Sequence, residues 1–196
     1  LKELSLAKKA VLSAGEILLN DNLINETFSS DKDIKLCADL KAEEIIKEIL
    51  SDESTYPILA EESGKSVEKL GDVYWIVDPL DGTANYARSI PISAISICLM
   101  SQLEPVLGVI YDFNNDNLYE GTKFTHALLN DKQIKVSKIN NPKSGVLITG
   151  LPNDTDYSDE ALTKMIKDFQ SWRKVRMLGS AAIASAYIAS GKADVY

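Results

Sequence analysis

The amino-acid sequence predicts a mixed α and β protein whose two parts are built differently. Apolar residues recur at spacings of three and four near the N-terminus, which is typical of amphipathic helices. Short apolar runs separated by turn residues dominate residues 73–136, and from Pro142 onwards strand-like and helix-like segments alternate. We therefore expect an α+β part over residues 1–137 and an α/β part over residues 138–196.

Two helices are expected in the N-terminal part of the chain. The first has a buried stripe made by Leu4, Ala7, Val11, Ala14 and Leu18. Residues 20–35 that follow are polar, and residues 29–33 among them are expected to form an exposed loop. The buried stripe of the second helix consists of Ala42, Ile45, Ile46 and Ile49. Asp39 lies in the first turn of this helix, where a carboxylate interacts favourably with the helix dipole, and this capping role is its simplest local explanation.

Strands are expected to make up most of the middle of the chain. Residues 56–60 form a short apolar run that ends in E-E-S-G, and residues 92–100 are nearly all apolar or small, as in a buried strand. Turn residues at 114–116 and at 130–131 each lie between two such runs, so both positions predict hairpins. After residue 142 the expected elements are a strand at 145–149, a helix near 158–171, a strand at 174–178 and a helix at 180–190.

Two carboxylates, Asp78 and Asp81, follow the apolar run that begins at Val73, and Pro79 separates them. Pro79 has no backbone N–H and fixes its own φ, so we expect the strand to stop there. Asp81 is then the expected N-cap of a helix, which leaves three amides without intrahelical partners, those of Gly82, Thr83 and Ala84. Two anionic ligands beside these donors suit a divalent cation that holds a phosphate, although D-P-x-D-G is also ordinary turn chemistry.

The composition argues against several classes of protein. The 196 residues include 29 acidic and 21 basic side chains, a net charge of −8, which argues against a nucleic-acid-binding protein. An acidic protein that handles an anionic substrate needs local positive charge, which a bound metal ion supplies. The sequence has no run of eighteen apolar residues and no basic segment ahead of an apolar one, so we expect neither a membrane partner nor a signal peptide. Cys37 and Cys98 are the only cysteines, and we expect buried, reduced thiols in a cytoplasmic protein.

Four acidic residues lie at or near the ends of expected helices and strands. Asp39 is at the start of a helix, Glu61 follows one strand, and Asp78 and Asp81 follow another. Ligand sites gather where strands end, because loops and helix N-termini meet there. An all-oxygen ligand set with no nearby histidine favours Mg²⁺ over zinc or iron.

Residues 75–86, W-I-V-D-P-L-D-G-T-A-N-Y, closely resemble the signature of the inositol monophosphatase family of Mg²⁺-dependent, lithium-sensitive phosphomonoesterases. Further similarities cover essentially the whole chain in order: A-D at 38–39, L-A-E-E-S at 59–63, Asn130 with V-S at 136–137, G-S-A-A at 179–182 and G-K-A-D at 191–194. The resemblance implies the layered αβαβα sandwich of the inositol monophosphatase and fructose-1,6-bisphosphatase type, with the metal site in the part over residues 1–137. Members of this family commonly dimerise, so a homodimer is expected.

The resemblance also implies a role for each residue of the site. Glu61, Asp78 and the carbonyl of Leu80 would hold a first Mg²⁺, and Asp78 and Asp81 would share a second, with two or three ions in all. The attacking water would lie near Glu61 and Thr83. The residues expected to act with these ligands are Asp39, hydrogen-bonded to the Thr83 hydroxyl, then Gly82, Thr83 and Ala84 on the phosphate, and Ser180 and Ala181 on the alcohol side.

The expected function is Mg²⁺-dependent hydrolysis of a small phosphorylated alcohol or sugar, with inositol monophosphate as the leading substrate. Fructose 1,6-bisphosphate, or a broader set of sugar phosphates, is the alternative within the family. The chain starts at Leu1 and stops at Tyr196 in a strand-like stretch, so we expect a longer polypeptide in which the α/β part continues. The family's W-D-x-A-A-G segment, which supplies the last carboxylate of the second metal site, would lie beyond Tyr196. A protein without that ligand would be a non-catalytic metal-binding scaffold, which is the alternative from another class.

Overall fold

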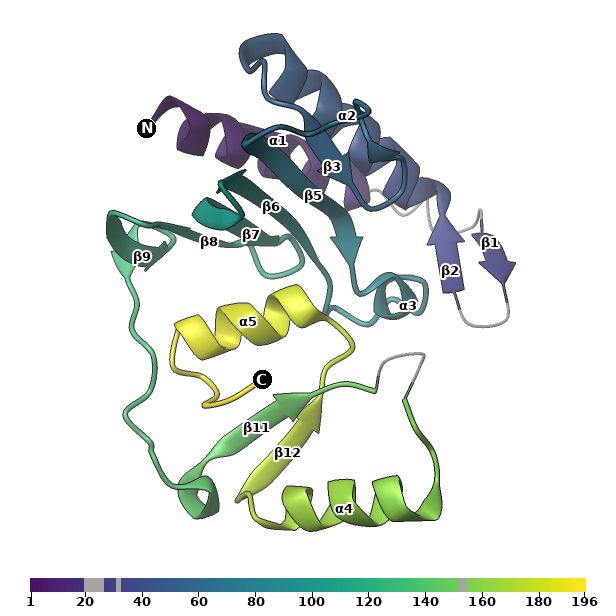
Figure 1. Cartoon of the computed structure of the whole chain (residues 1–196), viewed down its shortest axis with the longest axis vertical. Coiled ribbons are helices and arrows are strands. Elements are labelled where there is room, and N and C mark those ends of the chain that lie inside the picture. The colour runs from purple at the N-terminus through teal and green to yellow at the C-terminus, as the bar shows by residue number, and fades with distance from the viewer. Residues whose placement is uncertain (20–26, 31–32, 152–154) are drawn as a thin grey trace.

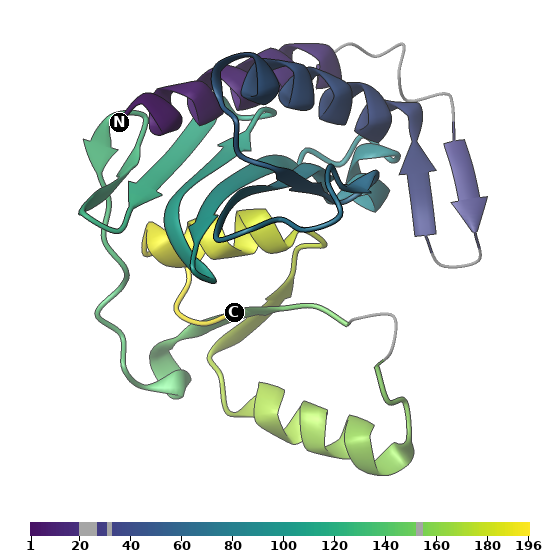
Figure 2. The same ribbon diagram turned by 45° about the horizontal axis from the view of Figure 1, so that its top comes forward.

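Helical and sheet layers alternate in the computed structural model of the chain, which describes residues 1–19, 27–30, 33–151 and 155–196. Figure 2 shows helices α1 (Lys2–Leu18) and α2 (Cys37–Glu53) above a large sheet, with α5 (Ala181–Ala189) beneath it. A small sheet and then α4 (Asp159–Gln170) follow below α5. The αβαβα sandwich expected from the sequence is therefore confirmed.

The large sheet has eight strands in the order β10-β9-β8-β7-β6-β5-β3-β4. In chain order they are β3 (Ile58–Ala60), β4 (Gly64–Lys65), β5 (Val73–Asp81), β6 (Ala94–Ser101), β7 (Glu104–Asp112), β8 (Asn117–Thr122), β9 (Thr125–Leu129) and β10 (Lys132–Gln133). Neighbouring strands are antiparallel except β3 and β5, which run parallel with Ala60 opposite Val77. Because β3 ends opposite Val77 while β5 continues to Asp81, the residue after β3 lies beside the C-terminal half of β5.

The main core lies between this sheet and helices α1 and α2, which cross it in Figure 1. Val11 of α1, Ile46 of α2 and Trp75 of β5 all have 0% of their surface exposed. The helical residues recur every three or four positions and the strand residues every two, as the sequence patterns predicted. The indole N–H of Trp75 donates to the Ser54 hydroxyl at 3.1 Å, so the buried ring keeps a hydrogen-bond partner.

A small parallel sheet and two helices make up the C-terminal part. Its strands are β11 (Val146–Thr149) and β12 (Lys174–Met177), which pair in parallel and are connected through α4. A second core lies around α5 and β11 and includes Ile148, Ala184 and Ala193. The carboxylate of Asp194 accepts hydrogen bonds from the Ser137 hydroxyl and from the Val146 amide, the latter at 2.6 Å. Asp194 therefore ties the segment that enters this part to the segment that ends it.

Both hairpin turns expected from the sequence are present. Asp116, Asn130 and Asp131 have positive φ values of 50°, 47° and 62°, as tight turns between strands require. The expectation of a loop over residues 29–33 was wrong in part, because Ser29, Ser30 and Asp33 belong to the antiparallel pair β1 (Thr27–Ser30) and β2 (Asp33–Leu36). Polar residues pair through the backbone as well as apolar ones, so the lack of an apolar run did not exclude these strands. Residues 20–26 and 31–32 lie outside the described parts of the chain.

Strand β5 does not stop at Pro79, contrary to the expectation from the sequence, but continues to Asp81. Its register with β6 changes from Asp78 opposite Ser96 to Asp81 opposite Ala94, which leaves one extra residue on β5. This β-bulge lets a residue without an N–H lie within a strand and redirects the side chains on either side of it. Within the described residues, no helix has the length and apolar character needed to cross a membrane.

Candidate active site

The parallel pair β3 and β5 brings two of the expected metal ligands together. Glu61 directly follows β3, and its amide donates to the carbonyl of Val77 at 3.0 Å, which extends the pairing of the two strands by one residue. Asp78 is the next residue on β5, so Glu61 and Asp78 are neighbours across the sheet. Glu61 is exposed and Asp78 is half-buried, so the pair lies at the boundary between the core and solvent.

The electrostatic environment of Asp78 is unfavourable for its ionised form. Burial, then the charges of Glu61 and Asp81, then a hydrogen bond with Glu61 raise the pKa of Asp78 to about 8. The amide of Leu80 acts in the opposite direction, since it donates to the Asp78 carboxylate at 3.2 Å. Carboxylates that repel one another in a partly buried site are a donor set that a divalent cation would stabilise. The chemistry of Glu61, Asp78 and Asp81 therefore fits Mg²⁺.

Asp81 does not cap the helix that follows it, contrary to the sequence-based expectation. The N-cap of α3 (Thr83–Tyr86) is Gly82, with φ of 88°. The Asp81 carboxylate instead accepts hydrogen bonds at the N-terminus of α5, from the Ser180 hydroxyl and from the amides of Ala181 and Ala182, at 3.2 and 2.8 Å for the two amides. A carboxylate gains at a helix N-terminus because the open amides and the dipole are both positive there. Local sequence could not reveal a partner about 100 residues away.

The acidic side chains are not gathered around one point. Among the residues that the structure describes, no three or more His, Cys, Asp and Glu side chains are arranged closely enough to hold a metal ion. Asp81 is directed towards α5, whereas Asp78 interacts with Glu61 and the Leu80 amide. Asp81 is therefore the ligand whose side chain would have to turn for all three carboxylates to share a cation.

Thr83 and Asp39 meet beside this group. The Thr83 hydroxyl lies 3.1 Å from a carboxylate oxygen of Asp39 and 3.0 Å from the carbonyl of Leu80. Asp39 is only 2% exposed although it is in the first turn of α2. The hydroxyl has one proton to donate, so its oxygen can still accept a hydrogen bond from a third group.

Two glycines allow the chain segments of the site to approach closely. A Cβ atom on Gly82 would lie 2.8 Å from the carbonyl oxygen of Ile92, and one on Gly179, whose φ is 72°, would lie 3.0 Å from the Asn85 amide nitrogen. The Asn85 side chain donates to the carbonyls of Ile92 and Leu178, at 2.8 and 2.7 Å. The sequence marked Asn85 only as part of a motif, and the structure shows that it joins α3 to the segment before α5.

A cavity of about 500 Å³ lies next to Asp81. Its lining consists of Thr149, Gly150, Leu151, Gly179, Ser180, Ala181 and Tyr196. Two of these residues, Ser180 and Ala181, contact the Asp81 carboxylate directly, so the cavity opens beside the acidic group. Ser180 is 5% exposed and also caps α5 by accepting from the Ile183 amide, whereas Ala181 is exposed.

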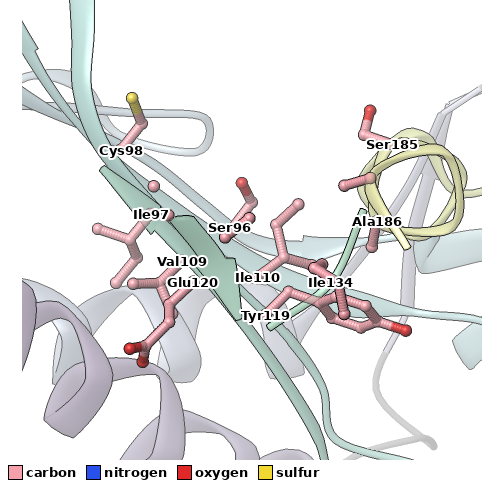
Figure 3. Close-up of a pocket in the computed structure, with 14 residues that line it drawn as sticks. Ser96, Ile97, Cys98, Val109, Ile110, Tyr119, Glu120, Ile134, Ser185 and Ala186 are labelled. Atoms are coloured by element: carbon pink, nitrogen blue, oxygen red, sulfur yellow. The ribbon is translucent and has the colours of Figure 1, made fainter. Parts of the chain in front are cut away.

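A second cavity, of about 300 Å³, lies between the large sheet and α5 and is shown in Figure 3. Ile110 and Tyr119 from the sheet and Ala186 from α5 are among its lining residues. Glu120 is the carboxylate in this lining, and it forms an ion pair with Lys8 of α1. The mostly aliphatic lining does not suit a phosphate ester, in contrast to the cavity beside Asp81.

One buried carboxylate was not recognised in the sequence as part of this region. Glu43 on α2 is 3% exposed, and its side chain accepts hydrogen bonds from the amides of Glu62 and Ser63. The signal was an acidic residue next to Ala42 of the buried stripe, one helical turn after Asp39.

Comparison with known proteins places the chain in a family. The family model described as the inositol monophosphatase family matches residues 2–196. The Nus factor SuhB of Pasteurella multocida is 31% identical over 202 residues, which cover 98% of this chain and 74% of that protein. The fructose-1,6-bisphosphatase/inositol-1-monophosphatase of Aquifex aeolicus is 34% identical over 200 residues, which cover 98% of this chain and 75% of that protein.

A solved structure supports the same grouping. The crystal structure of the extragenic suppressor protein suhB from Bartonella henselae superimposes with a TM-score of 0.91 and 32% sequence identity. The match covers 99% of this chain and 77% of that one. Similarity in sequence and in fold therefore extends over nearly the whole chain.

Proposed function

The chain belongs to the inositol monophosphatase family, and from this premise we propose that it hydrolyses the phosphate monoester of a small alcohol or sugar with Mg²⁺ as cofactor. The observation that carries the proposal is the raised pKa of Asp78 between Glu61 and Asp81, where β3 ends beside the parallel strand β5. A structural role alone gives no reason to collect like charges there. A divalent cation would relieve the repulsion.

In this proposal Glu61, Asp78 and the Leu80 carbonyl would hold one Mg²⁺, and Asp78 and Asp81 would hold another. When bound, the ions polarise the phosphoryl group, lower the pKa of a water molecule and stabilise the leaving oxygen. Such help is needed because the uncatalysed hydrolysis of phosphate monoesters is slower than the enzyme-catalysed reaction by up to ~10²¹-fold.

Thr83 orients the attacking water. Because the Thr83 hydroxyl donates its proton to Asp39, its oxygen is left to accept a hydrogen bond from the water. The exposed carboxylate of Glu61 is a second acceptor for that water. The buried Asp39 fixes the direction of the Thr83 hydroxyl by accepting its hydrogen bond, so it acts as a positioning group.

The substrate would lie between α3 and the cavity beside Asp81. The amides of Gly82, Thr83 and Ala84 are proposed to donate to the phosphate oxygens, as open amides at the start of a helix do. Ser180 and Ala181 line the cavity that would receive the alcohol, and about 500 Å³ accommodates a six-membered polyol. We propose inositol monophosphate as substrate. Fructose 1,6-bisphosphate is the alternative, because the Aquifex aeolicus relative is named for both activities.

A second candidate function is that of a non-catalytic binding protein. Two observations favour it: the Pasteurella multocida relative is named a Nus factor, and the carboxylates in the described residues are not arranged to hold a metal ion. The two candidates differ in whether phosphate is released.

The test is release of inorganic phosphate from three substrates, inositol 1-phosphate, fructose 1,6-bisphosphate and a nucleoside 3′-phosphate, with Mg²⁺ or with a chelator. We expect Mg²⁺-dependent release that is fastest from inositol 1-phosphate. The control is Asp78→Asn, which removes a proposed ligand and should release no phosphate. Release at the same low rate by both proteins would support the non-catalytic candidate. We also propose that the protein forms a homodimer and that lithium inhibits it, as the family suggests. Both can be tested on the same purified protein.

A further inference from the structure

Helix α2 buries a second carboxylate, Glu43, one turn after Asp39. Glu43 is 3% exposed and lies beside Ala42 and Ile46, which are 0% exposed. Burying an ionised carboxylate is unfavourable unless hydrogen bonds replace those it made to water. The partners of Glu43 therefore show what this side chain does.

Those partners are in the turn that carries Glu61. One carboxylate oxygen of Glu43 accepts from the amides of Glu62 and Ser63, at 3.0 and 3.3 Å. Hydrogen bonds from amides to a carboxylate are stronger than those between neutral groups. The two residues after Glu61 are thus held by one buried anion.

Lys47 completes the attachment from the next turn of α2. Its ammonium group lies 3.7 Å from the other carboxylate oxygen of Glu43 and donates to the Ser63 hydroxyl at 2.9 Å. Glu43 thus holds the backbone of the turn, and Lys47 links Glu43 to the Ser63 side chain of the same turn. Both contacts come from one face of α2, because the two residues are four positions apart.

The residue before this turn is also fixed. The Glu61 amide donates to Val77, so three successive amides, those of Glu61, Glu62 and Ser63, each have a defined acceptor. The backbone of Glu61 is therefore fixed, while its side chain is exposed and can reach a ligand. One turn earlier on α2, Asp39 holds Thr83 in the same way, through its hydroxyl.

We propose that Glu43 is a positioning residue, which sets the place of the Glu61 carboxylate for Mg²⁺ by holding the turn over residues 61–63 to α2. This inference rests on the proposed function, since it assigns Glu61 to the metal. Residues that orient a metal ligand from behind typically change metal affinity by 10–100-fold when they are altered. A residue that only stabilised the fold would lower the melting temperature and leave the metal affinity of the folded protein unchanged.

The experiment compares Glu43→Gln with Glu44→Gln in the whole chain. Both variants replace a glutamate of the same helix with its amide at adjacent positions, but Glu44 is exposed whereas Glu43 is buried. Mg²⁺ affinity is measured by titration calorimetry, amide exchange of Glu62 and Ser63 in the metal-free protein by NMR, and phosphate release separately. We expect Glu43→Gln to bind Mg²⁺ ~10-fold more weakly and to exchange these amides faster. Its kcat should fall with little change in KM, and Glu44→Gln should match the unaltered chain.

A second variant, Lys47→Met, keeps the proposal open to test even if Glu43→Gln fails to fold. Lys47 is partly exposed, so its loss should weaken Mg²⁺ binding in the same direction by a smaller factor. If Glu43→Gln folds and binds Mg²⁺ with the same affinity as Glu44→Gln, the inference is overturned. If Glu43→Gln does not fold, the inference is overturned when Lys47→Met binds Mg²⁺ with the same affinity as Glu44→Gln. An unaltered chain that binds Mg²⁺ but releases no phosphate would overturn the proposed function alone. An unaltered chain that binds no Mg²⁺ would overturn both.

Discussion

Helices α2 and α5 approach the site from opposite sides of the large sheet and stabilise it by opposite chemistry. Helix α2 supplies hydrogen-bond acceptors, since Asp39 accepts from Thr83 and Glu43 accepts from the turn after Glu61. Helix α5 supplies donors, the Ser180 hydroxyl and the first amides, all directed at Asp81. The α2 contacts fix groups that are proposed to act on water and metal. The α5 contacts instead engage the carboxylate of Asp81, which is itself a proposed metal ligand.

This difference has a consequence for the metal site. The groups held by α2 can keep their contacts when a cation binds, because Asp39 and Glu43 are not themselves proposed ligands. Asp81 has to share its carboxylate between the cation and α5. We therefore expect changes at the α2 side to affect the reaction and, through the position of Glu61, Mg²⁺ binding, while the C-terminal part stays attached. Changes at the α5 side should affect both the metal and the attachment of the C-terminal part.

Among the side chains that contact α2 or α5, the largest effect is expected for Asp81→Asn. It removes a proposed anionic ligand, and because metal ions contribute several kcal/mol to catalysis, Mg²⁺-dependent phosphate release should fall by ~10³-fold or more. The fold should persist, since the side-chain oxygen of asparagine can still accept a hydrogen bond from the N-terminus of α5, whose own N-cap is Ser180. Phosphate release and circular dichroism of the same sample provide the measurement. A variant with the unaltered rate and Mg²⁺ requirement would remove Asp81 from the site.

The next effect is expected for Thr83→Ala. The hydroxyl is proposed to orient water, whereas phosphate is held by amides and metal ions that the change leaves in place. We expect kcat to fall by ~10²-fold with little change in KM, as for loss of a positioned proton acceptor. Thr83→Ser retains the hydroxyl and is the matched control. A raised KM with an unaltered kcat would show that Thr83 binds substrate instead.

Binding of Mg²⁺ should depend on pH through Asp78, whose pKa is raised to about 8 by burial and by Glu61 and Asp81. The metal requires the ionised form of Asp78. As the pH is raised towards 8, the Mg²⁺ affinity should therefore increase by up to ~10-fold per pH unit, and above pH 8 it should level off. The metal-free protein should behave in the opposite sense. Between pH 4 and 8 the Asp78 carboxyl is protonated in the folded protein and ionised in the unfolded chain. The free energy of unfolding of the metal-free protein should therefore decrease as the pH rises towards 8. Calorimetric titrations and thermal melts at several pH values measure the two trends, and Asp78→Asn should abolish the second. Mg²⁺ affinity that is constant from pH 6 to 8 would contradict the assignment.

The smallest effect is expected for Ser180→Ala. Loss of the cap of α5 should reduce the free energy of unfolding by about 1 kcal/mol. For a chain of this size that lowers the melting temperature by about 2–4 °C. Because the two amides of α5 still hold Asp81, phosphate release should change less than in Thr83→Ala. A larger loss of activity than in Thr83→Ala would mean that the Ser180 hydroxyl contacts substrate.

The parts of the fold that depend on local periodicity were predictable from the sequence. The helices, the hairpin turns at residues 114–116 and 130–131, and the alternation after residue 142 all follow from spacings within about twenty residues. The β5 bulge was missed because Pro79 is unfavourable in a regular strand, and only its pairing with β6 shows that one extra residue is accommodated. The strands β1 and β2 were missed because they lack an apolar run.

For the candidate site, the sequence proposed a set of residues, but it could not give their contacts. Acidic residues at the ends of strands identified Glu61, Asp78 and Asp81, and the motif identified Thr83. The partners of Asp81 and Glu43 come from other elements, 100 and 19 residues away for the Ala181 and Glu62 amides, and no local pattern encodes them. Local capping rules predicted that Asp81 would cap α3, whereas in the folded chain its carboxylate contacts the N-terminus of α5.

The central claim is that Glu61, Asp78 and Asp81 hold the Mg²⁺ through which a phosphate monoester is hydrolysed. The most direct measurement is the rate of phosphate release from inositol 1-phosphate as a function of Mg²⁺ concentration, for the unaltered chain and for Asp78→Asn. The account predicts a rate that rises from zero and saturates for the unaltered chain and stays near zero for the variant. A rate that is independent of Mg²⁺, or equal in the two proteins, would contradict it.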